Sequence, residues 1–275
     1  MTNNIRRLVP LPFQGNKANH IQPFIEAIYS LPDDLIFVDL FGGSLYLSYV
    51  VHQLKPKARI ISNDYDNFRE RLNNIEITNQ ILDAIRFINP NKPTNSKFTE
   101  LEREQIRNIL TEFDGESALD ILTLSNALCF SSMRATNINQ LLSRHYYNRI
   151  PHKNYDVQWY KNALEGIEFV REDWQKLFER FKENEKVCFI TDPPYMNSDQ
   201  SGYAHKKWSF NDSLKTLKIF KHPHFIYFTS EKTNLFPIVE FIKDEFQPIS
   251  YTCHIIQRKP ANNRSRSWND LIIYR

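Results

Sequence analysis

A repeated pattern of short apolar runs constrains this sequence most strongly. Each run ends in a turn with glycine or an acid, and a helix-forming segment follows it. The runs are 35–38, 59–62, 167–170, 187–190 and 225–229. Short apolar runs that alternate with helices are typical of parallel strands buried on both faces. We therefore predict an α/β fold, in which helices cover both faces of a mostly parallel sheet.

Two further apolar runs, 249–257 and 271–274, close the chain. Only a polar segment separates them, so no helix fits between them. They are predicted to form an antiparallel hairpin at the edge of the sheet, which brings the predicted sheet to seven strands.

Residues 67–155 interrupt the alternation. Their apolar residues recur with a helical period in 69–88, 99–112 and 116–128, and a polar, basic loop follows at 131–156. No predicted strand lies among these helices. We therefore predict one domain from 1–66 and 156–275, with 67–155 inserted as a helical subdomain.

Glycine is scarce, with six residues in 275, so its position is informative. Gly42 and Gly43 follow the first predicted strand, in a strand–turn–helix arrangement that suits a nucleotide. Asp64 follows the second strand, where a carboxylate can accept hydrogen bonds from a ribose diol. This spacing also fits a general dinucleotide-binding unit, and Asp64 alone also fits a surface turn.

Asp192-Pro193-Pro194-Tyr195 follows the apolar run 187–190. Two prolines stiffen the turn and donate no hydrogen bonds, so a carboxylate, a carbonyl and an aromatic ring keep fixed positions. Such a set can grip a planar ring that carries an amine. Taken alone, the four residues fit better a plain proline turn whose aspartate caps the next helix, and the rest of the chain decides against that interpretation.

The net charge of +3 indicates little, but the basic residues are clustered. Five Lys or Arg residues face one acid between 134 and 161, and five face one acid from 258 to the end. Basic clusters among aromatic and amide side chains suit nucleic-acid contact, although two solvated basic faces would look the same.

Neither the cysteines nor the histidines predict a metal site. Cys129, Cys188 and Cys253 are widely spaced in apolar surroundings, which indicates reduced core residues, and the histidines lack paired ligand spacing. No segment has the length and apolarity of a membrane span or a signal peptide, so we expect a cytoplasmic protein.

The order of these motifs resembles the Dam-like DNA adenine-N6 methyltransferases, which are amino-methyltransferases with an Asp-Pro-Pro-Tyr motif. The shared elements, in chain order, are Gly15-Asn16-Lys17, Asp39-Leu-Phe-Gly-Gly43, Asp64, the insert, Asp192–Tyr195 and Asn262-Asn263-Arg264 before 270–274. The resemblance covers most of the chain and is weak over 67–130.

The resemblance implies a Rossmann-like seven-stranded mixed sheet, the fold of methyltransferases that depend on S-adenosylmethionine, with 67–155 as the target-recognition subdomain. It implies a site-specific enzyme that moves a methyl group from S-adenosylmethionine to N6 of a flipped-out adenine in double-stranded DNA. The expected protein is a monomer in a bacterial or phage-infected cell, without metal. Whether a cognate restriction endonuclease is a partner stays open.

The resemblance also implies roles for individual residues. The catalytic residues would be Asp192, Pro193, Pro194 and Tyr195. The cofactor would be held by Asn16, Lys17, Asp39, Phe41, Gly43, Asp64, Asp173, Trp174 and Asp192. Of these, Asp173 could equally be a helix cap. DNA would be bound by Arg134, Asn137, Arg144, Tyr146, Tyr147, Asn148 and Arg149, and by Asn263, Arg264 and Arg266 of the terminal hairpin.

These DNA assignments follow the chemistry of base recognition. Arginine suits guanine, asparagine suits adenine, and a tyrosine ring can fill the space that a flipped base leaves. Arg264 and Arg266 would hold phosphates, although solvated hairpin charges are the alternative.

One position departs from the family pattern: Leu45 stands where the family usually has a second glycine. We interpret it as a residue of the helix core, and cofactor affinity is the property it could affect. Two other functions stay open. The tetrapeptide would also serve cytosine N4 or an RNA base, and a cofactor-free protein that only binds nucleic acid would keep the basic clusters.

Overall fold

The computed structural model describes residues 5–15, 17, 21–115, 119–195, 208–233, 237–241, 251–258 and 268–275. Its strands are β1 (Ile36–Asp39), β2 (Ile60–Asn63), β3 (Glu168–Val170), β4 (Val187–Thr191), β5 (Phe225–Ser230), β6 (Thr252–Arg258) and β7 (Trp268–Tyr274). Its α-helices are α1 (Ile21–Ser30), α2 (Tyr46–Leu54), α3 (Phe68–Asn73), α4 (Ile75–Ile88), α5 (Glu100–Asp114), α6 (Ile121–Leu128), α7 (Ile138–Ser143), α8 (Gln158–Ala163), α9 (Trp174–Phe181) and α10 (Phe210–Thr216). Short 3-10 turns, η2 (Ser131–Met133), η3 (Leu217–Lys221) and η4 (Glu231–Thr233), complete the elements used below.

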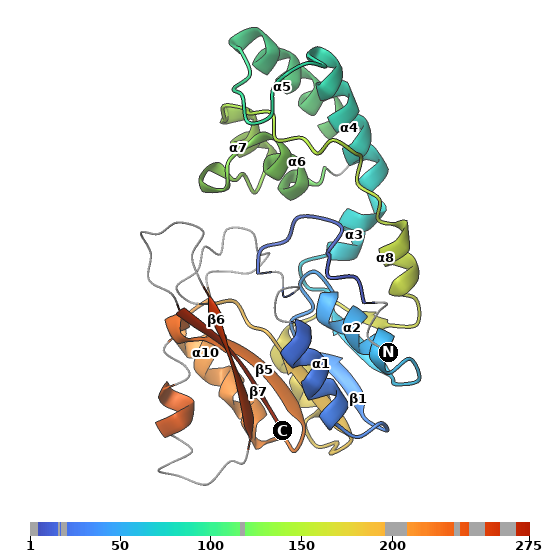
Figure 1. Cartoon of the computed structure of the whole chain (residues 1–275), viewed down its shortest axis with the longest axis vertical. Coiled ribbons are helices and arrows are strands. Elements are labelled where there is room, and N and C mark those ends of the chain that lie inside the picture. Colours follow the sequence, from blue (N-terminus) through green and yellow to red (C-terminus); the bar gives the residue numbers. More distant parts are fainter. Residues whose placement is uncertain are drawn as a thin grey trace. The chain divides into compact units, whose positions relative to one another are not determined.

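The described strands form one seven-stranded sheet in the order β3-β2-β1-β4-β5-β7-β6 (Figure 1). The five strands from β1 to β5 run parallel, and β7 lies antiparallel to both β5 and β6. The sequence-based prediction of a mixed seven-stranded Rossmann-like sheet with a terminal hairpin is therefore confirmed.

Helical segments pack on both faces of the sheet, and β5 shows why. Neighbouring residues of a strand point to opposite faces. The ring of Tyr227 packs against Phe220 of η3, with centroids 5.1 Å apart, whereas Phe228 packs against Phe24 of α1 at 5.7 Å. Both faces of this strand are therefore buried, as its uninterrupted apolar run predicts.

The chain divides into two compact units. We call Met1–Leu8, Gly15–Asn67 and Ala163–Arg275 the sheet unit, and Val9–Gln14 with Phe68–Asn162 the helical unit. The predicted division, with the insert at 67–155, differs in three places: the helical unit begins at Phe68, extends to Asn162 and includes Val9–Gln14. Long-range contacts explain the third difference, because Arg71 donates a hydrogen bond to the carbonyl of Pro12 (2.8 Å) and Phe13 packs edge-on against Phe68.

The helical unit has its own apolar core, to which α4, α5, α6 and α7 contribute. Its elements differ from the prediction in detail. The helix predicted over 69–88 is broken at Asn74, and the loop predicted over 131–156 contains η2 and α7. Asn137 starts α7 because its side chain accepts a hydrogen bond from the backbone N–H of Gln140 (2.9 Å), a typical N-cap.

Candidate functional site

The carboxyl ends of the parallel strands gather the predicted site residues of the sheet unit. Asp39 at the end of β1 pairs in register with Ser62 of β2 and Ile190 of β4, and Thr191 pairs with Tyr227 of β5. The turns that follow these strands therefore start side by side. This edge is where open α/β sheets bind ligands.

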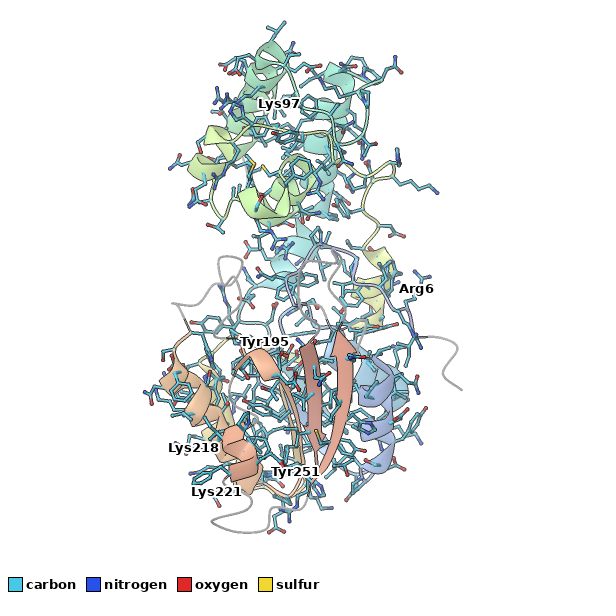
Figure 2. All side chains as sticks on the ribbon, turned by 60° about the vertical axis from the view of Figure 1, so that its left-hand side comes forward. Arg6, Lys97, Tyr195, Lys218, Lys221 and Tyr251 are labelled. Atoms are coloured by element: carbon cyan, nitrogen blue, oxygen red, sulfur yellow. The ribbon has the colours of Figure 1, made fainter. Side chains whose placement is uncertain are left out.

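The Asp192–Tyr195 turn leaves β4 at this edge (Figure 2). Pro193 and Pro194 are buried, whereas Asp192 and Tyr195 remain partly exposed. The prolines therefore anchor the turn in the protein, and the Asp192 carboxylate and the Tyr195 ring are only partly exposed at the edge.

Lys17 contacts two groups of this turn, the Asp192 carboxylate and the Tyr195 ring. Its ammonium lies 2.5 Å from Oδ2 of Asp192 and 5.3 Å from the centroid of the Tyr195 ring. It also donates a hydrogen bond to the carbonyl of Gly15 (3.0 Å), and its side chain is 10% exposed. Lys17 was predicted to lie near a cofactor carboxylate, and here it forms an ion pair with the predicted catalytic carboxylate.

Asp39 stabilises the turn that follows β1. Its carboxylate accepts hydrogen bonds from the Ser48 hydroxyl (2.8 Å) and the Phe41 N–H (3.2 Å), and Ser48 also contacts the Ser62 hydroxyl. The residue is fully buried, and this burial raises the pKa of the carboxyl to about 7. Asp39 therefore stabilises the turn after β1 from inside the protein, and its carboxylate is not at the surface.

The glycine turn packs closely against the end of β2. A Cβ atom on Gly42 would lie 2.8 Å from both the Asn63 carbonyl and the Ser62 hydroxyl, so only glycine fits. Gly43 has φ 51°, and Leu45 has φ 63°. A positive φ at position 45 is a backbone conformation that favours glycine.

Leu45 itself is fully buried. Leu45 is therefore a core residue, but it precedes α2 rather than lying within the helix, and its backbone is left-handed. Its side chain lies against the glycine turn, 3.1 Å from where a Cβ atom on Gly42 would be.

Asn63 connects three turns at the ligand edge, and the sequence analysis did not single it out. Its amide donates to the carbonyls of Leu40 (3.1 Å) and Glu172 (2.9 Å) and accepts from the Glu172 N–H (3.1 Å). The next residue, Asp64, is 5% exposed. In the sequence, the sign of this role is an asparagine directly before the acid at the end of a strand, where its amide can link neighbouring turns.

Asp173 and Trp174 begin α9 at the same edge. The exposed Asp173 accepts a hydrogen bond from the Gln175 N–H (2.8 Å), so the helix-cap interpretation holds for this residue. Trp174 packs against Phe41 with ring centroids 5.5 Å apart. Trp208 contacts Phe41 at 5.6 Å and is a member of this aromatic group that the sequence analysis missed.

These residues fit S-adenosylmethionine by their chemistry. The partly exposed Phe41, against which Trp174 packs, offers an aromatic face for its adenine, and the Asp64 carboxylate offers an acceptor for its ribose diol. The Lys17 ammonium offers a partner for its carboxylate. The carboxylate, the ribose diol and the adenine ring of the cofactor thus each have a matching group on one sheet edge.

Three of the predicted DNA-binding residues support the fold of the helical unit. Tyr146 is fully buried, and its hydroxyl donates to the Leu141 carbonyl (3.1 Å). Asn148 donates to the Lys92 carbonyl (2.7 Å), and Arg149 donates to the Cys129 carbonyl (2.6 Å). The prediction that Tyr146 contacts DNA is wrong in this structure, because its ring is part of an apolar core.

The other residues of that loop are more accessible. Asn137 is exposed, and Arg134, Arg144 and Tyr147 are partly exposed. Tyr147 packs on Phe130 at 4.7 Å, and Arg134 bonds Gln14 at 3.3 Å. The Nε atom of Arg144 is buried without a hydrogen-bond partner among the described residues. Asn16, Asn263, Arg264 and Arg266 lie outside the described residues.

Within the described part of the chain, no group of three His, Cys, Asp or Glu side chains is placed to hold a metal ion. No described helix is both long and apolar enough to cross a membrane.

Comparison with known proteins gives a family match over most of the chain. Residues 13–247 match the family described as D12 class N6 adenine-specific DNA methyltransferase. A Haemophilus influenzae protein named as a methyltransferase is 30% identical over 241 residues, which cover 86% of this chain and 80% of the relative. A solved structure, the precorrin-6y C5,15-methyltransferase of Geobacter metallireducens, aligns over 99% of this chain and 93% of its own. Its TM-score of 0.36 and identity of 11% are too low to bear on fold or function.

Proposed function

The chain belongs to the family of D12 class N6 adenine-specific DNA methyltransferases, and on this premise we propose that it methylates adenine at specific sequences of double-stranded DNA after the base has left the helix. The family implies S-adenosylmethionine as the methyl donor. The observation that carries the proposal is the Asp192–Tyr195 turn, which presents a carboxylate and an aromatic ring at the ligand edge of the sheet.

The turn can overcome the poor reactivity of the adenine amine. The N6 lone pair is delocalised into the ring, so N6 alone is a weak nucleophile. The Asp192 carboxylate and the Pro193 carbonyl accept the two N6–H hydrogen bonds, which favours a tetrahedral nitrogen with a localised lone pair. The proton that N6 loses passes to the Asp192 carboxylate, its hydrogen-bond acceptor.

Tyr195 holds the base from its face. An adenine can reach this edge only outside the duplex, where an aromatic side chain replaces the stacking that the base has lost. The buried prolines fix the position of the Tyr195 ring relative to Asp192, and this alignment supplies much of the rate.

The cofactor supplies an electrophilic methyl group on a sulfonium. In this chain, Asp64 would accept hydrogen bonds from the ribose hydroxyls, and Phe41 and Trp174 would line the site of the cofactor's adenine ring. Asp39 and Asn63 would not contact the cofactor themselves; they stabilise the turns that carry the residues that contact it. These roles place the methyl donor and the Asp192 turn on one rigid sheet edge.

The helical unit supplies the DNA contacts that select the sequence. Arg134, Asn137 and Arg144 carry the side-chain types that read base edges, and Tyr147 offers a ring. Arg264 and Arg266 hold backbone phosphates. Replacing a base-reading arginine relaxes specificity at one position, whereas replacing a phosphate contact weakens binding to all sequences alike.

Expression in a host without adenine methylation tests the proposal. Nucleoside analysis of the host DNA should detect N6-methyladenine, and sequencing should place it at one short recurring sequence. An Asp192→Ala control should give none. N4-methylcytosine, or modified bases found only in RNA, would replace the adenine assignment, and an absence of all three would overturn the enzymatic function.

A further inference from the structure

Lys17 occupies the position from which the target amine must be held. Its ammonium lies 2.5 Å from Oδ2 of Asp192, the carboxylate that accepts N6–H in the proposed function. It also lies over the Tyr195 ring, 5.3 Å from the centroid. A base stacked on Tyr195 would have its atoms within the same range of distances, because stacked rings lie 4.5–7 Å apart. The ammonium and the target amine would therefore compete for Oδ2 of Asp192.

We propose that Lys17 is a positioning residue that couples the two substrates. In the cofactor-free protein it neutralises Asp192 and covers Tyr195, and it moves to the carboxylate of the cofactor when that carboxylate arrives. Asp192 is then released to accept the adenine amine. The inference rests on the proposed function and adds an order of events to it: the cofactor prepares the site for the base.

Burial explains why the ammonium needs a second anion before it moves. The Lys17 and Asp192 side chains are 10% and 15% exposed, so water screens their attraction only weakly. Separating a buried pair leaves both charges without compensation, which is strongly unfavourable. Exchange of one carboxylate for another keeps the ammonium paired throughout.

The surroundings of Lys17 allow this exchange. The nearby Asp39 carboxylate is fully buried and bonds Ser48 and the Phe41 N–H, so it does not compete for the ammonium. Among the described residues, Lys17 also contacts the Gly15 carbonyl at 3.0 Å and the rings of Tyr195 and Phe228. These are neutral groups that a flexible four-carbon side chain can leave.

Calorimetry with two ligands tests the exchange without DNA. S-adenosylhomocysteine carries the amino-acid carboxylate, and 5′-methylthioadenosine lacks it. Asp192→Asn removes the competing charge, so it should tighten S-adenosylhomocysteine binding about five-fold or more, in the range of ordinary coupling between sites. Binding of 5′-methylthioadenosine should not change. In a Lys17→Met background, Asp192→Asn should have no effect on either ligand.

Other outcomes of the same calorimetry would contradict the exchange. If Asp192→Asn leaves S-adenosylhomocysteine binding unchanged or weaker, Lys17 does not move between the two carboxylates. Lys17→Arg keeps the cation, so it should preserve part of the coupling. Lys186→Met removes an exposed lysine that pairs with Asp34 on the same unit. This control variant should preserve the full coupling between Asp192 and S-adenosylhomocysteine binding.

Base capture is the second readout. A duplex with the methylated sequence that the host-DNA experiment identifies would carry 2-aminopurine in place of the target adenine. The fluorescence of 2-aminopurine rises when the base leaves the stack. In the wild type, saturating S-adenosylhomocysteine should tighten capture about five-fold more than saturating 5′-methylthioadenosine. Lys17→Met should abolish the difference. An equal effect of both ligands on the wild type would overturn the coupling alone, whereas no fluorescence rise under any condition would overturn the proposed function with it.

Discussion

The ammonium of Lys17 lies 2.5 Å from Oδ2 of Asp192, so two residues separated by most of the chain form an ion pair at the ligand edge of the sheet. The pair connects the loop that precedes α1 with the turn that follows β4. Because this ion pair lies at the proposed active site, substitutions at the site test its chemistry directly.

Asp192→Asn should lower the rate of methyl transfer by ~10²–10³-fold, the usual loss when one preorganised electrostatic contact to a reacting group is removed. The asparagine keeps the size of the side chain but removes the negative charge that the N6 amine requires. Single-turnover kinetics measure the effect, and the melting temperature checks that the fold is intact. Activity within a few-fold of wild type would contradict the catalytic role of Asp192.

Tyr195→Ala should weaken capture of the target base by ~1–3 kcal/mol, the usual contribution of one base stacked on an aromatic side chain. Tyr195→Phe and Tyr195→Trp should lose much less, because both keep a ring face. The measurement is KM and kcat for DNA in all three variants. Equal losses in the three would show that the hydroxyl, rather than the ring, is the required group.

Asp64→Ala should raise the Kd for S-adenosylhomocysteine by an amount equivalent to ~1–3 kcal/mol, because ribose hydroxyls would lose a buried acceptor. Glu183→Ala is a suitable control, since the Glu183 side chain is 88% exposed in the same unit. Calorimetry compares the two variants. If both leave the Kd unchanged, another group binds the ribose.

Leu45→Gly should be more stable than Leu45→Ala by ~1 kcal/mol. Both variants lose the same buried side-chain contacts, but only glycine relieves the left-handed backbone at φ 63°. Leu47, buried inside α2, is the matched control: there the glycine variant should be less stable than the alanine variant by ~0.5–1 kcal/mol. Chemical denaturation of the four variants checks both signs, and the same sign at both positions would contradict the backbone argument.

Asp39 should make stability depend on pH. Burial raises the pKa of its carboxyl to about 7, whereas an unfolded chain has ~3.9. Between these values the folded state keeps a proton that the unfolded state has released. The stability contributed by Asp39 is therefore fully present below ~pH 4 and is lost as the pH rises through about 7.

Asp39→Asn does not titrate, so the melting temperature of the variant relative to wild type should rise between pH 5 and pH 8. Asp34→Asn is a control of opposite sign, because the hydrogen bond from Lys186 lowers the pKa of the Asp34 carboxyl. Its effect should disappear as the pH falls. A difference between Asp39→Asn and wild type that is the same at both pH values would contradict the assignment.

Local sequence patterns determined the elements of the sheet and the turns that carry its chemistry. Apolar runs predicted the strands, and the glycine and proline turns predicted where ligand groups emerge, because both depend on neighbouring residues alone. The positions of Asp64 and of Asp192–Tyr195 after β2 and β4 were therefore predictable. So was the terminal hairpin, since too few residues separate its strands for a helix to form.

Tertiary structure decided which distant residues meet. No local pattern shows that Lys17 pairs with Asp192, or that Tyr146 is buried while Tyr147 is partly exposed. The left-handed backbone of Leu45 likewise follows from how the turn after β1 packs on the end of β2, where Gly42 leaves no space for a Cβ atom. These features depend on the energy of contacts between segments far apart in the chain, which neighbouring residues do not encode.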